Sequence, residues 1–163
     1  MVNILFHTEN GKQQAADFLE ILVANSNDVH SSFVLRVLDL MRDIEEFPAS
    51  AEHFGEFLST ENELKANHEL LKKLKPYTVP PIYELRIDYA GSVIRMFYFT
   101  IRDSFSAPFY VFTEAYEFTK EHMEKGIKNA VTEQARQRAH TIASKYKQNP
   151  DAYIRKSGGY DND

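Results

Sequence analysis

Two arginines stand inside an apolar and aromatic stretch of the sequence, where a buried charge is costly unless it serves a purpose. Residues 83–100 read YELRIDYAGSVIRMFYFT, with Arg86 in the first half and Arg95 in the second. The period-two pattern and the turn-forming residues 89–92 predict a hairpin with one arginine on each strand. A guanidinium group stays charged and grips two phosphate oxygens at once. The pair therefore has the chemistry to stabilise negative charge that develops on a phosphate.

Cysteine, histidine and glycine are placed in ways that argue against several other kinds of chemistry. The chain contains no cysteine, which excludes disulfide bonds, thiolate metal sites and a cysteine nucleophile. Its six histidines include no pair four residues apart and lie at positions 7, 30, 53, 68, 122 and 140. A glycine-rich phosphate loop, a serine-nucleophile elbow and a dinucleotide-binding fingerprint are absent from the sequence. We therefore expect neither a metal ion nor a cofactor.

Charged residues are distributed unevenly along the chain, although the formal net charge is -5. Residues 1–63 hold 3 basic and 12 acidic side chains, whereas residues 64–102 hold 7 basic and 3 acidic ones. Residues 120–147 hold a further 7 basic side chains against 3 acidic ones. This asymmetry predicts an acidic half and a basic surface suited to phosphate groups. The alternative is that these charges only solvate helix surfaces.

The spacing of apolar residues predicts an α+β fold in which the arginine hairpin belongs to an antiparallel sheet. The Thr60-x-x-Glu63 pattern is a capping box for one helix, which would end at Lys72, Lys73 and Lys75, where cations favour the helix dipole. The expected elements, in chain order, are a strand at 2–7, a helical hairpin at 12–25 and 28–47, helical turns at 50–58, a helix at 60–75, a meander of strands at 82–88, 93–101 and 109–118, and a long helix at 119–147.

Length and composition predict one domain. The chain has 163 residues and 43% hydrophobic content, which suits a single core at residues 1–147. Residues 148–163 lack an apolar pattern and are expected to form a flexible C-terminal tail. No apolar run approaches the roughly 18 residues of a membrane-spanning helix, and the N-terminus does not resemble a signal peptide. We therefore expect a cytoplasmic protein without a membrane partner.

Three stretches of the sequence resemble the phage-derived branch of the RelE/HigB toxins, ribosome-associated mRNA endonucleases of toxin-antitoxin systems. Residues 71–99, LKKLKPYTVPPIYELRIDYAGSVIRMFYF, carry the most specific part, a leucine pair with lysines followed by Y-E-L-R and R-x-x-Y. Residues 8–22, TENGKQQAADFLEIL, are similar to the family's entry into its first helix. Residues 118–139 are similar to its closing F-x-K-K element and the helix that follows.

The resemblance implies a RelE-like microbial ribonuclease fold and metal-independent endoribonuclease activity that inhibits translation. In this reaction a ribose 2′-hydroxyl attacks its own adjacent phosphate. The resemblance gives Arg95 and then Arg86 the main catalytic roles, on a sheet face that opens into a shallow concavity for RNA. Tyr98 and Lys120 match further family positions, as a stacking or proton-carrying group and as a phosphate contact. The residues expected to bind RNA are Lys72, Lys73, Lys75, Arg136 and Arg138.

The expected partners are mRNA, the ribosome and a cognate antitoxin, a helix-turn-helix protein encoded by the adjacent gene.

Three site positions have two interpretations each. Because side chains alternate along a strand, Tyr98 is expected on the face opposite Arg95 unless a bulge intervenes, and sheet core explains it equally well. Glu121 replaces the family's second lysine, either as a general base or with weaker RNA affinity. His122 is either a proton shuttle or a helix-surface residue.

Two functions from different classes follow from these residues. The first is the toxin, which the Y-E-L-R and R-x-x-Y segments favour. The alternative is a catalytically weak binding module, or a phage-encoded regulator that acts through protein contacts. The acidic composition, with a sequence pI near 5.7, and Glu121 favour this alternative.

Overall fold

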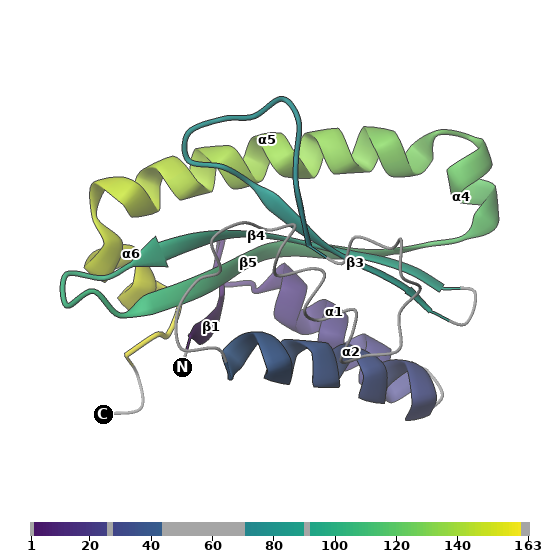
Figure 1. Ribbon diagram of the computed structural model, residues 1–163, viewed down its shortest axis with the longest axis horizontal. Helices are drawn as coiled ribbons and strands as arrows, with labels where there is room; N and C mark the ends of the chain where they lie inside the picture. The colour runs from purple at the N-terminus through teal and green to yellow at the C-terminus, as the bar shows by residue number, and fades with distance from the viewer. Residues whose placement is uncertain (1, 26–27, 44–70, 90–91, 161–163) are drawn as a thin grey trace.

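A five-stranded sheet with helices on both faces makes up the fold, which is α+β (Figure 1). The computed structural model describes residues 2–25, 28–43, 71–89 and 92–160. The strands lie in the order β1-β5-β4-β3-β2. Their bounds are β1 (Asn3–Phe6), β2 (Leu71–Lys73), β3 (Tyr83–Tyr89), β4 (Ser92–Arg102) and β5 (Pro108–Phe118).

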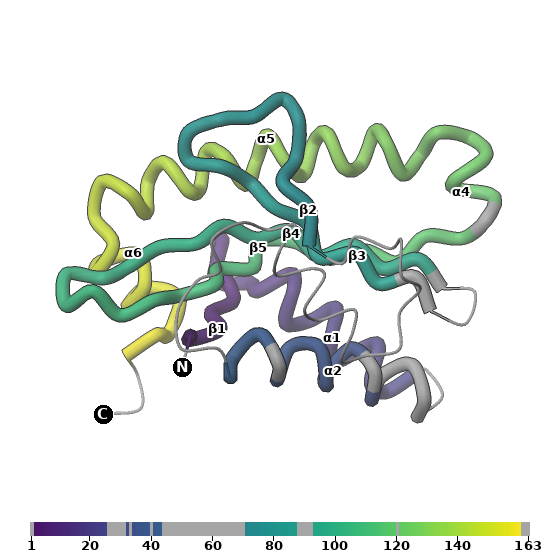
Figure 2. The backbone as a smooth tube through the Cα atoms, in the orientation of Figure 1, coloured from purple at the N-terminus to yellow at the C-terminus, as the bar shows by residue number. Residues whose placement is uncertain are grey.

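The connections explain how a short first strand enters the sheet. β3, β4 and β5 form an antiparallel meander, and β2 joins its edge by antiparallel pairing with β3. β1 instead pairs in parallel with β5, with Asn3 opposite Phe109. A parallel pair requires a long crossover, and the helices that follow β1 are part of that connection (Figure 2).

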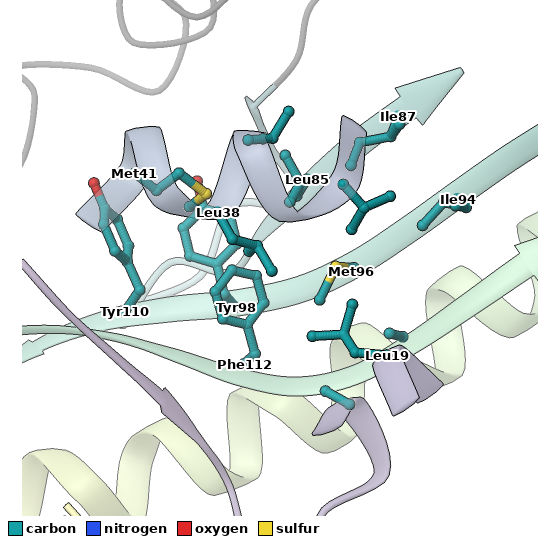
Figure 3. Close-up of a cluster of buried hydrophobic side chains, with 14 of the residues drawn as sticks. Leu19, Leu38, Met41, Leu85, Ile87, Ile94, Met96, Tyr98, Tyr110 and Phe112 are labelled. Atoms are coloured by element: carbon teal, nitrogen blue, oxygen red, sulfur yellow. The ribbon is translucent and has the colours of Figure 1, made fainter. Parts of the chain in front are cut away.

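Two helices, α1 (Gln14–Asn25) and α2 (Asp28–Arg42), cover one face of the sheet (Figure 1). Their buried apolar residues recur every three or four positions and so form one stripe on each helix. These stripes pack on alternate residues of the strands to form the first core, shown in Figure 3. The residues labelled there are Leu19, Leu38, Met41, Leu85, Ile87, Ile94, Met96, Tyr98, Tyr110 and Phe112.

The opposite face of the sheet is covered by one long helix, α5 (Ile127–Gln148), which lies on the far side from α1 and α2 (Figure 1). Its buried residues Ala135, Ala139 and Ala143 recur every fourth position, and the stripe continues to Tyr146. Small side chains let the helix approach the sheet closely. They pack on Phe97, Phe99, Phe109 and Val111 to form the second core.

The long helix expected at 119–147 is interrupted. Thr119 caps a short helix, α4 (Lys120–Glu124), and its hydroxyl accepts a hydrogen bond from the His122 N–H at 3.2 Å. Gly126 then takes a left-handed conformation, with φ 70°, before α5 begins. Glycine adopts this conformation at little cost, which allows α5 to start in a new direction.

Most elements expected from periodicity are confirmed, including the first strand, the two helices before residue 43, and the meander. The helix expected at 60–75 is wrong at its C-terminal end. Leu71–Lys73 form β2, in which Lys72 lies opposite Glu84. The lysines there do not end a helix. The elements expected at 50–58 and 60–70 lie outside the described residues.

The flexible tail expected at 148–163 is wrong for residues 150–160, which fold back onto the sheet. Asn149 caps a final helix, α6 (Pro150–Lys156), and proline occupies its first position, where no N–H is needed. Ile154 is fully buried in the second core. The Tyr160 hydroxyl donates to Asp103 at 2.8 Å. Local sequence pattern does not predict this docking, because Asp103 and the second-core residues that the segment contacts lie far away along the chain.

A chain of hydrogen bonds fastens α5 and α6 to the end of β1. His7 Nε2 lies 2.6 Å from Glu9 Oε2, and His7 Nδ1 lies 2.9 Å from the Tyr146 hydroxyl. The Tyr146 hydroxyl lies 2.8 Å from Ser157 Oγ, which accepts from the Thr8 N–H at 2.9 Å. The bond to His7 holds the pKa of the Glu9 carboxyl below its ordinary value. The two ends of the described chain are therefore joined.

Candidate functional site

The two arginines face each other across the hairpin. Arg86 on β3 lies directly opposite Arg95 on β4, so both project from the face that α5 covers. The prediction that they share a face is confirmed. The shallow concavity expected around them is wrong for Arg95, which is only 2% exposed and donates from Nη1 to the Ile94 carbonyl at 2.9 Å. The Arg86 side chain is 24% exposed.

A buried carboxylate lies beside these cations and was missed from the sequence. Glu84 precedes Arg86 by two residues on β3, so both side chains project from the same face. Its Oε1 lies 3.5 Å from Arg86 Nε, and the residue is 6% exposed. Burial raises the pKa of Glu84, and this effect exceeds the opposing influence of the nearby Arg95 and Arg86 charges. The period-two pattern contained the signal, since it places the Glu in Y-E-L-R beside the arginine.

A basic pocket opens beside Glu84, and we call it the lysine pocket. It has a volume of about 400 Å³ and is lined by Lys72, Lys73, Leu74, Lys75, Tyr77, Glu84, Lys128, Asn129 and Thr132. Its charged groups are lysine ammoniums apart from the Glu84 carboxylate. The structure thus brings Lys72, Lys73 and Lys75 together with Glu84, although they lie on and after a strand instead of at a helix end.

An aromatic ring stands at the lysine pocket. Tyr77 is 60% exposed, and its ring centroid lies 5.1 Å from Lys73 Nζ and 5.8 Å from Lys75 Nζ. An exposed ring flanked by ammonium groups offers stacking for a base and charge for a phosphate. This combination is typical of single-stranded nucleic-acid binding.

The first turns of α5 are loosely packed where they border the lysine pocket. No side chain in residues 127–134 is fully buried, and the first buried position of the helix is Ala135. Lys128, Asn129 and Thr132 from these turns line the pocket together with Glu84. The first turns of α5 therefore cover the charged residues only loosely, whereas the helix packs closely on the sheet from Ala135 onward.

Tyr98 belongs to the first core. Its side chain is buried among the residues shown in Figure 3, on the face opposite that of Arg95. Its ring centroid lies 5.4 Å from that of Tyr83. Burial raises its pKa well above the ordinary value. The register of β4 against β5 shifts between Phe97 and Tyr98, but Tyr98 remains in the first core. The structure therefore favours the sheet-core interpretation of Tyr98, because the side chain lies away from the arginines.

The residues around α4 do not join the lysine pocket. His122 Nδ1 accepts from the Thr119 N–H at 3.2 Å, so this ring completes a helix cap. Glu121 pairs with Lys125 at 2.7 Å on the exposed surface and is not placed as a general base. Lys120 is the first residue of α4. A structural role is therefore the better interpretation of His122.

Arg136 and Arg138 each form a salt bridge with a glutamate carboxylate. Arg136 is buried and pairs with Glu133 at 2.7 Å, one turn away on α5. Arg138 Nε and Nη2 both donate to Glu114, each at 2.8 Å. The Glu114 hydrogen bond raises the pKa of Arg138 further. Neither arginine lines the lysine pocket, so the structure separates them from the lysines with which they were grouped.

Comparisons with protein-family models, curated proteins and solved structures found no match. The RelE/HigB resemblance therefore stays a prediction that depends on the residues themselves. Within the described ranges there is no group of three His, Cys, Asp or Glu side chains suited to a metal ion. Helices in the same ranges are too short or too polar to cross a membrane.

Proposed function

We propose that this protein is a toxin of the RelE/HigB type, a ribosome-associated endoribonuclease that cuts mRNA and inhibits translation. The observation that carries the proposal is the lysine pocket with Glu84 in its lining and Arg86 3.5 Å from that carboxylate. The lysines would hold the RNA backbone, and Tyr77 would stack on a base. A cognate antitoxin would neutralise the protein by covering this pocket.

The chemistry assigns different tasks to the charged groups. Glu84 accepts the proton of the ribose 2′-hydroxyl, and the 2′-oxygen attacks the adjacent phosphorus. The bond from phosphorus to the 5′-oxygen breaks, and that oxygen takes a proton from water. Arg86 stabilises the charge on the phosphate as it develops. Because burial raises the pKa of Glu84, its carboxylate is a stronger base than an exposed one.

Arg95 has a supporting task in this mechanism. With 2% of its surface exposed, it does not reach an RNA bound in the lysine pocket. Its charge opposes the effect of burial on the Glu84 pKa. We therefore assign Arg95 to the positioning and charge balance of Glu84 and Arg86, in place of the direct phosphate contact expected from the sequence.

Replacement of Glu84 by glutamine is expected to lower mRNA cleavage about 100-fold or more, because general-base catalysis contributes that much. The measurement is growth of a bacterial host upon induced expression, with primer extension on a reporter mRNA. Wild type should arrest growth and produce new cuts, and Glu84→Gln and Arg86→Ala should not. The matched control is Glu20→Gln, an exposed acid on α1 on the opposite face of the sheet.

The pH dependence of cleavage by purified protein and ribosomes gives a second readout. The rate should rise with pH as Glu84 loses its proton, at a pKa above the ordinary value for a glutamate. Glu84→Gln should abolish this rise. Intact mRNA in the presence of soluble wild-type protein would refute the endoribonuclease proposal.

The second candidate function is an RNA-binding module without strong cleavage. The burial of Arg95 beneath α5, together with the pairing of Arg138 to Glu114, favours it. Binding of single-stranded RNA that is never cut, with normal host growth, would establish this function instead of the toxin.

The lysine pocket predicts the same RNA affinity pattern for both candidates. Lys73→Ala and Lys75→Ala should each weaken single-stranded RNA binding, and each should reduce the slope of log K against log salt by about 0.7. Tyr77→Ala should weaken binding by about 1–3 kcal/mol through loss of stacking. Fluorescence anisotropy at several salt concentrations measures both effects. Lys147→Ala, an exposed lysine near the far end of α5, is the control and should change neither.

A further inference from the structure

A second cavity lies beside α5 at the opposite edge of the sheet from the lysine pocket, and we call it the His7 cavity. Its walls come from the loop after β1, from β5, and from the C-terminal half of α5. The volume is about 410 Å³, within the range of about 300–1,000 Å³ typical of small-molecule sites. The residues that line it include His7, Lys12, Thr113, Arg138, Ile142 and Lys145.

One wall of the cavity is rigid and polar. His7 is buried, and both ring nitrogens are held, Nε2 by Glu9 at 2.6 Å and Nδ1 by Tyr146 at 2.9 Å. Because an ionised carboxylate only accepts hydrogen bonds, His7 Nε2 is the donor to Glu9. The ring therefore keeps one orientation at the cavity, and it does so without any ligand.

Irregular backbone borders the cavity on two sides. The pairing of β4 with β5 moves from Phe97 opposite Glu114 to Tyr98 opposite Phe112, which leaves Thr113 as an extra residue in β5. Such bulges are common beside functional sites. In the loop after β1, Asn10 has φ 52° and Gly11 has φ 76°. This turn brings the backbone of Lys12 back to form a β-bridge with the backbone of Glu9. Both irregularities shape the cavity wall.

Charge at the cavity points to an anionic ligand. Arg138 is already neutralised by Glu114, and His7 is bonded to Glu9. Lys12 and Lys145 form no hydrogen bond or ion pair through their side chains in the part of the chain that the structure describes, and Lys145 acts on Glu9 only through space. Two ammonium groups are therefore available to a ligand, and Ile142 supplies an apolar wall.

We propose that the His7 cavity binds a small organic acid. Its carboxylate or phosphate monoester group lies between Lys12 and Lys145, and its apolar body lies against Ile142. This site is independent of the proposed RNA cleavage, because it shares no lining residue with the lysine pocket. Charge neutralisation by two lysines gives affinity, and the apolar wall selects an acid with a hydrophobic part.

Phenylacetate and phenyl phosphate are suitable probes, because each carries one of the two acidic groups on the same kind of ring. Titration into nitrogen-15-labelled protein should produce saturable amide shifts at Thr113 and Ile142. Acetate and inorganic phosphate, which lack the ring, and benzyl alcohol, which lacks the charge, should bind at least tenfold more weakly. The tighter of the two aromatic probes identifies the acidic group that the site prefers.

The double variant Lys12→Ala with Lys145→Ala should weaken the better probe at least tenfold. Both side chains are at or near the surface, so the amide spectrum should otherwise keep its dispersion. Lys147→Ala, a lysine two residues away that does not line the cavity, should leave binding unchanged. Shifts that never saturate, shifts located elsewhere, or equal affinity in the double variant would overturn the proposal.

Discussion

Replacement of Arg95 by alanine is expected to destabilise the fold by about 3–5 kcal/mol, the usual cost of removing one partner from a buried group of charges. Arg95 is 2% exposed and is among the largest fully buried side chains. Its positive charge is the main one that favours the ionised form of Glu84. Without Arg95, the buried Glu84 carboxylate loses the main positive charge that stabilises its ionised form. Removal of the side chain also leaves a cavity between β4 and α5.

Urea denaturation of wild type and Arg95→Ala measures this loss. A double-mutant cycle with Glu84→Gln isolates the coupling, because removing the carboxylate also removes the need for the cation. The double variant Glu84→Gln with Arg95→Ala should therefore cost less than the two single variants added together. Arg155→Ala, at an exposed position of α6, is the control for loss of an arginine. A loss below about 1 kcal/mol for Arg95→Ala would contradict the buried role.

From the sequence alone, Arg95→Ala is expected to lower cleavage far more than stability. Burial reverses this expectation, because a folded fraction that falls also lowers cleavage. Activity of this variant therefore has meaning only when it is measured on protein shown to be folded. The more exposed Arg86 is the better test of a direct phosphate contact.

Replacement of Ile154 by alanine is expected to cost about 2–5 kcal/mol and to release α6 from the sheet. Ile154 is fully buried in the second core, next to the alanine stripe of α5. Release of α6 also removes Ser157 from its contacts with Tyr146 and Thr8. The loss is therefore expected to exceed that of a peripheral isoleucine, and deletion from Pro150 onward should be at least as damaging.

Hydrogen exchange and urea denaturation check this result. Ile154→Ala should accelerate exchange throughout α6 and at Thr8, whereas Ala152→Ser, at an exposed position of the same helix, should leave exchange unchanged. Gly159→Ala gives an independent test, since a Cβ there would lie 2.3 Å from Ile154 Cγ2. Its cost should shrink in the Ile154→Ala background. Unchanged exchange in Ile154→Ala would show that α6 is held by other contacts.

Local pattern was sufficient for the elements whose apolar residues face one partner. The period of two in residues 83–101 predicted the two strands that carry Arg86 and Arg95, and the apolar spacing after Thr119 predicted a long helix. These patterns arise because each element buries one face. They depend only on neighbours within a few residues of one another.

Prediction was wrong where the decisive contact was distant along the chain. Leu71–Lys73 form a strand because β3 offers an edge, although the leucine spacing favours a helix. Periodicity assigns Arg95 to a face but does not reveal that α5 covers that face. The polar segment after Gln148 docks because Thr8, Tyr146 and Asp103 receive it. The Glu84 site and the His7 cavity depend on the same long-range assembly.

The parallel pairing of β1 with β5 sets the order in which a growing chain completes this fold. Asn3 pairs with Phe109, and the Thr8 N–H donates to Ser157 Oγ. The first strand therefore cannot form all its contacts until most of the described residues have been synthesised. Until then its edge has no partner, and such distant contacts slow folding. A nascent chain that still lacks α6 leaves the Tyr146 hydroxyl without Ser157. The last residue that lines the lysine pocket is Thr132, so the lining of the proposed RNA-binding surface is synthesised before α6 is available to close the molecule.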